Sequence, residues 1–285
     1  MGVLLKRNIK LYFRDKINLL LSLLAILIII ALYALFLGNV WEYEEIMGLP
    51  ELDILRDSWL TAGILAVATV TTSMGAFAVI VDDRINKINK GFYASPVKRS
   101  NITSGYILSA FLVGVIMTVI TAIPLGLYLL FLGGESLTLI AYVQVFGLIL
   151  LTSLSSTAMV CFIVSLLKSY GAFTTASTIL GTLIGFLMGI YLPIGVLPEA
   201  VQTAMKLFPP SHAAMLFRQM LLEVPMERSF EGVPVVYLEE FQEMMGVVFK
   251  FGDFEVTPII SVAVLVVSAL VFYGLSLLNM RKMGK

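Results

Sequence analysis

Cysteine and histidine are almost absent from this chain, and their scarcity limits the chemistry it can perform. Its 285 residues include one cysteine, Cys161, and one histidine, His212. A lone cysteine cannot form an intrachain disulfide, and in an apolar stretch it is expected to be a small buried hydrophobic side chain. A metal site built from His and Cys needs several ligands, and the sequence holds no such cluster. We therefore predict no metal site and no catalytic residue on this chain.

Charged residues are also scarce. Only 13% of the residues are charged, whereas 59% are hydrophobic and the mean hydropathy is +0.97. An ordinary soluble domain is about 25% charged and at most about half apolar, so the composition indicates an all-α membrane protein, which we expect to form a single transmembrane domain over residues 1–285. Six stretches without Asp, Glu, Lys or Arg are long enough to cross about 30 Å of hydrocarbon as helices. These predicted spans lie at about 19–37, 58–81, 105–132, 140–167, 172–192 and 257–280.

The remaining charges are divided unevenly between the two sides of the predicted membrane, although the net charge is zero. When the loops are assigned alternately, the side that holds both termini carries 14 of the 19 Lys and Arg residues but only 3 of the 19 Asp and Glu residues. Short cytoplasmic loops retain Lys and Arg during insertion. We therefore expect both termini in the cytoplasm of a plasma membrane, and the short loops suit a prokaryotic protein.

Residues 2–17 precede the first span and form an imperfect amphipathic pattern. At helical spacing they present two stripes, a basic one of Lys6, Lys10 and Arg14 and an apolar one of Leu5, Ile9 and Tyr12. This pattern predicts a helix that lies on the anionic cytoplasmic leaflet of the lipid bilayer. The alternative interpretation is a basic topology signal with no further role.

Two energy sources are missing from the sequence. Carriers driven by an ion gradient usually need ionisable groups at membrane depth, and the predicted spans contain no Asp, Glu, Lys or Arg. No G-x-x-x-x-G-K-[ST] phosphate-binding loop occurs either, and the predicted cytoplasmic loops are too short to bury a nucleotide-binding core. Ion coupling is therefore disfavoured, and any energy from ATP has to come from another subunit.

The segment Asp82–Ser104, between the second and third spans, is short and basic. It carries five Lys and Arg residues and one Pro. At helical spacing its apolar and basic positions separate into two groups, one of Ile85, Ile88 and Phe92 and one of Arg84, Lys87 and Lys90. The pattern predicts a surface helix that docks against something. Apart from the N-terminus it is the largest predicted cytoplasmic feature, and thus the natural contact for an energy-supplying subunit.

Small and hydroxyl side chains recur in two of the predicted spans. The second span has only hydroxyls as polar groups, among them Thr69, Thr72 and Ser73, which either line a path or hydrogen-bond back to their own helix. In the fifth span, small residues recur every fourth position, at Ser177, Gly181, Gly185 and Gly189. Such a face lets helices approach closely, as a seam within the chain, a subunit interface or a pore wall, and plain packing is the simplest of these.

The outer loop at about 193–256 is longer than a connector requires and rich in proline. After Pro209 and Pro210, Ser211 is expected to cap an apolar helix to about Leu222, which is too short to span the membrane. A second helix has an apolar stripe opposite an acidic face, and the stripe includes Phe241, Met245 and Val248. We interpret these helices as an extracellular lid over a pore, or as a cap that only shields the ends of the spans.

Taken together, these features resemble the ABC-2 type permeases, the membrane subunits of ATP-driven exporters. The resemblance covers nearly the whole chain: the basic amphipathic N-terminus, the six spans, the loop KGFYASPVKRSNITSGYILSAF and the outer segment YLPIGVLPEAVQTAMKLFPPSHAAMLF. The most specific match is Ala94-Ser95-Pro96-Val97 followed by Lys98-Arg99. The family usually has an E-x-E-x-G-T run before this point, where this chain has Asp82-Asp83-Arg84-Ile85-Asn86-Lys87.

The resemblance implies a mechanism and partners. In that family the loop bears a coupling helix, which fits a groove on an ABC ATPase subunit that binds ATP and Mg²⁺; this chain itself is expected to carry no cofactor. The coupling residues implied here are Arg84, Ile85, Lys87, Ile88, Lys90, Phe92, Tyr93 and Ala94. The resemblance further implies pairing with a second permease copy or a paralogue and a path lined by the second and fifth spans. No nucleic-acid partner is expected.

The function that the resemblance implies is export by alternating access, and a mostly apolar, uncharged pathway suits an amphiphile, whether lipid-like, peptide or drug-like. Two other classes of protein stay open at this point. One is a non-transporting assembly or immunity factor that uses the basic loop as a binding platform. The other is an ion-coupled secondary transporter, which the lack of charged groups in the spans disfavours.

Overall fold

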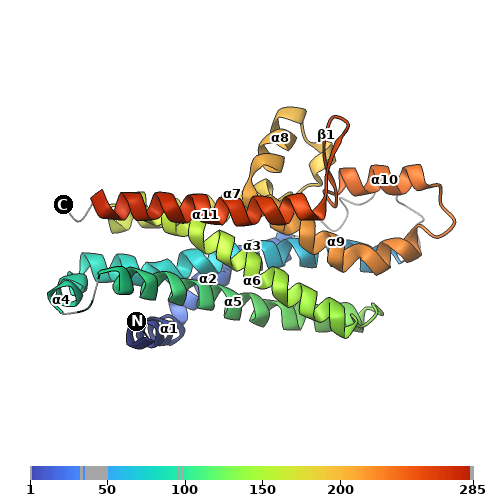
Figure 1. Ribbon diagram of the computed structural model, residues 1–285. Helices are drawn as coiled ribbons and strands as arrows, with labels where there is room; N and C mark the ends of the chain where they lie inside the picture. The colour runs from blue at the N-terminus through green and yellow to red at the C-terminus, as the bar shows by residue number, and fades with distance from the viewer. Residues whose placement is uncertain (1, 33–34, 36–50, 96, 98, 283–285) are drawn as a thin grey trace.

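The protein is a bundle of long helices that run roughly side by side (Figure 1). The computed structural model describes residues 2–32, 35, 51–95, 97 and 99–282. Within these residues, five helices are long and apolar enough to cross a membrane. They are α3 (Leu52–Ile85), α5 (Arg99–Phe131), α6 (Leu139–Leu166), α7 (Tyr170–Leu187) and α11 (Pro258–Lys282).

A sixth candidate span depends on how the N-terminal helices are counted. Helix α1 (Gly2–Arg14) is followed directly by α2 (Lys16–Leu32), and the two axes are bent by 73°. If this bent pair is one span, the described residues hold six. The predicted first span at 19–37 begins within α2, and its residues 33–34 and 36–37 lie outside the described part of the chain.

Local sequence explains where several helices begin. The hydroxyl of Thr138 accepts a hydrogen bond from the Ala141 amide at 3.2 Å and caps α6. Ser169 does the same for α7, accepting from the Ala172 amide at 3.1 Å. Each cap satisfies one backbone donor that the first helical turn would otherwise leave without a partner. The short connection between α6 and α7 is therefore fixed at its C-terminal edge by a side chain.

Helix α3 is the central element of the bundle. It packs against α5, α6, α9, α2 and α7. Its side chains are buried along almost the whole length, from Leu55 to Val81. A helix that is covered on most sides needs no polar stripe, which explains why apolar residues are distributed around the whole circumference of α3.

The two ends of the bundle differ in construction. The short helix α4 (Ile88–Ala94) and the C-terminal end of α11 lie at one end, with α1 crossing nearby (Figure 1). The outer segment lies at the other end (Figure 1). It consists of the 3-10 turn η3 (Ile194–Val196), α8 (Glu199–Leu207), α9 (Pro209–Ser229), α10 (Val235–Met244) and strands β1 (Phe249–Phe251) and β2 (Phe254–Val256).

The β-hairpin was not predicted from the sequence. Its strands pair antiparallel, with Phe249 opposite Val256 and Phe251 opposite Phe254. Two residues connect them, and the first, Gly252, has a φ of 59°, a conformation that favours glycine and is typical of tight hairpins. The expectation of an exclusively α-helical chain therefore misses this hairpin, because a three-residue strand gives almost no periodic signal.

Two helices differ from the sequence-based bounds for identifiable reasons. Helix α7 ends at Leu187 rather than near 192, because Gly189 has a φ of 62° and the chain turns back there. Helix α9 starts at Pro209 and continues to Ser229, beyond the expected end at Leu222. Ser211 is not its cap, since its hydroxyl donates to the carbonyl of Leu187 at 2.7 Å.

Candidate functional site

The basic segment folds as two helices joined by a sharp turn. Helix α3 continues to Ile85, and α4 begins at Ile88. Between them, Lys87 has a φ of 59°, a left-handed conformation that is uncommon for residues other than glycine. The residues expected to form one stripe therefore belong to different helices, with Ile85 on α3 and Ile88 and Phe92 on α4.

One face of this turn is open. Ile85 and Ile88 are 44% and 42% exposed, and Lys87, Lys90 and Ala94 are exposed as well. Exposed isoleucines flanked by lysines make a surface on which both apolar contact and charge attraction can act. Arg84 is turned inward, where its guanidinium donates to the carbonyl of Leu167 at 2.8 Å. Tyr93 lies within α4, but its side chain is outside the described set.

The other face of α4 docks onto the bundle through Phe92. This ring packs against a small buried cluster of Val79, Ile102 and Tyr106. The guanidinium of Arg7, from α1, lies 5.4 Å from the centre of the Phe92 ring. A cation over an aromatic face at this distance is attractive. Helix α4 is therefore in contact with three other helices, namely α1, α3 and α5.

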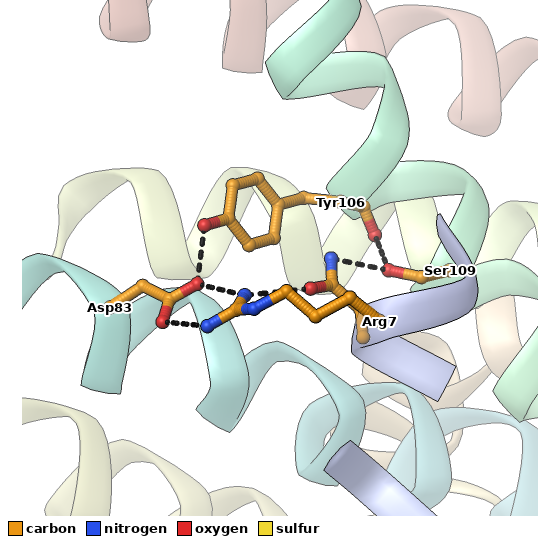
Figure 2. Close-up of polar contacts among 5 residues, drawn as sticks. Arg7, Asp83, Tyr106 and Ser109 are labelled. Atoms are coloured by element: carbon orange, nitrogen blue, oxygen red, sulfur yellow. Dashed lines mark hydrogen bonds and ion pairs between the residues drawn. The ribbon is translucent and has the colours of Figure 1, made fainter. Parts of the chain in front are cut away.

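Beside Phe92, a polar network joins the same helices (Figure 2). Arg7 donates two hydrogen bonds to the carboxylate of Asp83, at 2.6 and 2.7 Å, and the Tyr106 hydroxyl donates to the same carboxylate at 2.5 Å. Asn8 accepts from Arg7 at 3.0 Å and donates to Ser109 at 3.2 Å. Asp83 is only 3% exposed, whereas the Arg7 side chain is 30% exposed. Bidentate pairing of this kind fixes the relative orientation of the guanidinium and the carboxylate, in addition to the attraction between them.

The ion pair between Arg7 and Asp83 stabilises the charged form of Arg7. The hydrogen bond from Arg7 to Asp83 raises the pKa of Arg7, against the opposing effect of partial burial. We refer to Arg7, Asp83, Phe92 and Tyr106 together as the α4 junction. It links the exposed turn to the N-terminal helix and to two long helices of the bundle, so a displacement of α4 reaches α1, α3 and α5 through direct side-chain contacts.

The hydroxyls of α3 are enclosed by packing. Thr69 and Ser73 are fully buried and contact α6, where Thr69 lies 2.9 Å from the Ser156 hydroxyl and Ser73 lies 3.2 Å from that of Thr157. Thr72 donates to the backbone carbonyl of Ala68 at 2.5 Å. Within a single chain these side chains therefore hold α3 to α6 and to its own backbone.

The small residues of α7 have mixed surroundings. A side chain at Gly185 would collide with the ring of Tyr191, whereas one at Gly181 would meet no atom within 4 Å. Gly189 lies beyond the end of α7 and forms the turn there, so it does not continue the helical face of Ser177, Gly181 and Gly185. Most of α7 is uncovered, with large apolar side chains exposed at Ile179, Leu183 and Phe186.

The outer-lid residues are packed into the bundle. Phe241 is 4% exposed and its ring lies 5.1 Å from that of Phe230. The carbonyl of Met245 accepts a hydrogen bond from the indole of Trp59, on α3, at 2.8 Å. Val248 is half-buried and lines a cavity of about 960 Å³ between α6, α9, α10 and α11. The outer segment is thus attached to α3 by specific contacts.

Arg218 on α9 is a buried residue that sequence reasoning missed. It is 1% exposed and donates to the carbonyls of Met188 at 3.0 Å and Gly189 at 2.8 Å, at the end of α7. Its guanidinium also lies 4.6 Å from the centre of the Trp59 ring. The signal available in the sequence was an arginine inside an otherwise apolar helix. Asp83, an acidic residue within a basic segment, was a comparable signal for the α4 junction.

Comparison with known families identifies the protein class. The model described as ABC-2 family transporter protein matches residues 41–278 of this chain. The chain belongs to the ABC-2 transporter family. A search among curated proteins found no match. Membership confirms the resemblance drawn from the coupling-loop and outer-segment motifs, and it makes the chain the multi-pass membrane component of a transporter.

Cofactor chemistry has no evident site on this ABC-2 protein. In the described ranges, no group of three or more His, Cys, Asp or Glu side chains is placed to hold a metal ion. Members of the family are generally non-catalytic membrane components that pair with ATPase subunits.

Proposed function

We propose that this chain is the permease subunit of an ATP-driven exporter that moves an amphiphile out of the cell by alternating access. A separate ABC ATPase subunit binds ATP and Mg²⁺ and docks on the exposed turn around α4. Both termini and α4 lie on the cytoplasmic side, and the outer segment from η3 to β2 lies outside. The positive charge of the termini and of the Asp82–Ser104 segment supports this orientation.

The observation that carries the proposal is the two-sided character of α4. Its outward surface offers Ile88, Lys87 and Lys90 to a partner, while its inward face is held by the α4 junction. A helix that served only as a loop cover would need no ion pair anchoring its neighbours. Closure of two ATPase subunits would shift α4, and the junction would pass that shift to α1, α3 and α5.

The pathway is proposed to form between two permease subunits, either two copies of this chain or this chain and a paralogue. Helix α7 supports this arrangement because its exposed apolar side chains and open Gly181 face are suited to close packing. Ser177 on α7 is then a further candidate for the seam, whereas Thr69, Thr72 and Ser73 on α3, with Gly185 and Gly189, are enclosed within one chain and would reach the pathway wall only after the helices around them move apart. Phe241, Met245 and Val248 belong to the outer lid.

An amphiphilic substrate suits the chemistry of these helices. The α3 and α7 residues proposed for the pathway offer hydroxyls, glycines and apolar side chains, with no charged group among them. Such a surface stabilises an apolar molecule with a polar end better than it stabilises a bare ion, whose dehydration it cannot offset.

The test is co-purification of this chain with a candidate ABC ATPase subunit expressed together with it. Lys87→Glu and Lys90→Glu together should reduce the ATPase recovered with the permease by about tenfold, because two attractions become two repulsions. The matched control is Glu239→Lys with Glu240→Lys, an equal charge reversal on the exposed face of α10 at the opposite end. That control should leave recovery unchanged.

The functional assay is ATP hydrolysis in lipid, measured with and without candidate amphiphiles. We expect the permease to alter the rate of ATP hydrolysis by its partner, and amphiphiles to change it further. The exporter proposal fails if no ATPase co-purifies and the double reversal at α4 leaves export intact. Stable recovery of a complex that never transports would favour an assembly or immunity factor instead.

A further inference from the structure

A second cavity in the structure opens on the flank of the bundle between α5 and α6, against the C-terminal half of α9. Its volume is about 720 Å³, within the range of about 300–1,000 Å³ that is typical of small-molecule sites. Four of its wall residues are roughly half exposed, namely Ile123, Leu127, Tyr142 and Phe146. The cavity is therefore entered from the side of α5 and α6 and is separate from the α3 and α7 residues assigned to the pathway.

Two buried hydroxyls reach this cavity from α3. Ser58 and Thr61 line it and are 2% and 4% exposed. Among the residues that the structure describes, neither hydroxyl forms a hydrogen bond, and both oxygens are open to the cavity rather than enclosed by protein. Hydroxyls elsewhere on the same helix, such as that of Thr72, bond back to the backbone, and buried polar groups are normally paired. The two hydroxyls are thus available to a molecule inside the cavity.

The charge at the cavity wall is negative. Its lining includes four carboxylates and one guanidinium, that of Arg228. Arg228 is already paired with Glu51, at 3.6 Å, and with Glu135. Glu223 and Glu227 lie one turn apart on α9, and neither forms an ion pair with any residue in the described ranges. Both side chains are exposed to solvent, so two carboxylates without an ion-pair partner among the described residues lie at the open edge of a largely apolar cavity.

We propose that this cavity binds a cationic amphiphile. Its apolar body lies between α5 and α6, its positive charge lies beside Glu223 and Glu227, and Ser58 and Thr61 hydrogen-bond to its polar atoms. Charge complementarity selects a cation over an anion of the same shape. As a statement about what is transported, this rests on the exporter function proposed above. As a statement about binding, it concerns the permease alone.

The probe pair is tetraphenylphosphonium and tetraphenylborate, two ions of nearly the same shape and opposite charge. Binding is measured by equilibrium dialysis of the full-length permease in the neutral detergent dodecyl maltoside, without ATPase or nucleotide. We expect saturable binding of the phosphonium and none of the borate. Glu223→Gln with Glu227→Gln should weaken the phosphonium affinity roughly tenfold, since both attractions are lost.

Two glycines provide a matched pair that locates the bound ion. Gly126 lines the α5–α6 cavity, and Gly147 lines the 960 Å³ cavity on the other side of α9, which Glu223 and Glu227 also border. A Cβ atom added at either position meets no atom within 4 Å. Gly126→Leu should therefore fold normally and abolish phosphonium binding by filling the cavity, whereas Gly147→Leu should leave it unchanged.

Three results would overturn the proposal: no saturable phosphonium binding, equal binding of the borate, or binding that survives Gly126→Leu. Loss of binding only in Gly147→Leu would likewise reject this cavity. Failure of the ATPase to co-purify would remove the exporter function and leave this result standing, so the two proposals fail separately.

Discussion

Replacing Arg218 tests whether the buried guanidinium holds the outer segment to the bundle. In Arg218→Met the side chain keeps an unbranched apolar stem but loses the guanidinium, with its charge and donors. The carbonyls of Met188 and Gly189 then lose their donor, and the Trp59 ring loses its cation. Hydrogen bonds from a charged donor contribute about 1.5–3 kcal/mol each, and a desolvated cation–π contact about 2 kcal/mol.

The expected net cost is smaller than that sum, because the arginine itself gave up hydration when it was buried. A buried carbonyl that loses its donor typically costs about 1–3 kcal/mol, so the two carbonyls together cost about 2–6 kcal/mol. For a chain of this size that corresponds to a fall in Tm of roughly 10 °C. Tryptophan fluorescence during heating is a suitable assay, since Trp59 lies at the contact itself.

Arg56→Met is the matched control for this measurement. The Arg56 side chain is 26% exposed and pairs with Asp53 and Asp57 near the start of α3, both at 3.0 Å. Ion pairs that reach solvent contribute at most about 1 kcal/mol. If Arg218→Met unfolds at the same temperature as Arg56→Met, the guanidinium does not anchor the end of α7, and the proposed attachment of the outer segment is wrong.

Three further outcomes follow from the contacts of Arg7, the α7 glycines and His212. Arg7→Ala should leave ATPase co-purification intact but lower amphiphile-dependent ATP hydrolysis severalfold, because α4 still presents its outer surface while the α4 junction is broken; an unchanged stimulation would remove the junction from the mechanism. Gly185→Leu should destabilise the monomer by about 1–3 kcal/mol through its clash with Tyr191, measured as a loss of Tm. Gly181→Leu should leave Tm unchanged but reduce cross-linking between permease subunits. If Gly181→Leu lowers Tm and Gly185→Leu alone reduces cross-linking, α7 is not the seam in the way proposed. For His212, burial lowers the pKa, and the hydrogen bond that Nε2 donates to the Lys206 carbonyl at 3.0 Å only partly opposes this effect, so the fold favours the neutral ring. Stability should therefore fall as the pH drops below about 6.5, by at most about 1.4 kcal/mol per pH unit, and His212→Gln should flatten this part of the profile of Tm against pH.

Much of the helical architecture could be predicted because membrane spans leave a strong signal in composition. The cores of α3, α5, α6 and α11 coincide with stretches of the sequence that contain no charged residue. The ends of these helices were less predictable. Helix α3 extends past its uncharged core at both ends, since Asp57 and Asp83 find partners in Arg56 and Arg7 and can remain inside the helix.

The exposure of the basic turn was predictable, but its construction was not. Charge and spacing indicated that Lys87 and Lys90 lie at the surface, as the structure shows, and their contact with a partner stays a prediction. The anchoring by Arg7 joins residues 76 positions apart, and no periodicity within one segment reports a contact of that range. The turn at Lys87 was equally hidden, because lysine carries no local preference for a left-handed conformation.

That turn has a mechanical consequence. Since Lys87 interrupts the helix, α4 is not a rigid extension of α3. The direction of α4 depends on the backbone torsion angles of Lys87 and on the packing of Phe92 against the bundle. A left-handed backbone conformation at a residue with a Cβ costs about 1–2 kcal/mol, so the turn between the two helices is slightly strained. Under the proposed coupling, a force applied to α4 by the ATPase would therefore reach the bundle as a torque about this turn rather than as a push along a helix axis.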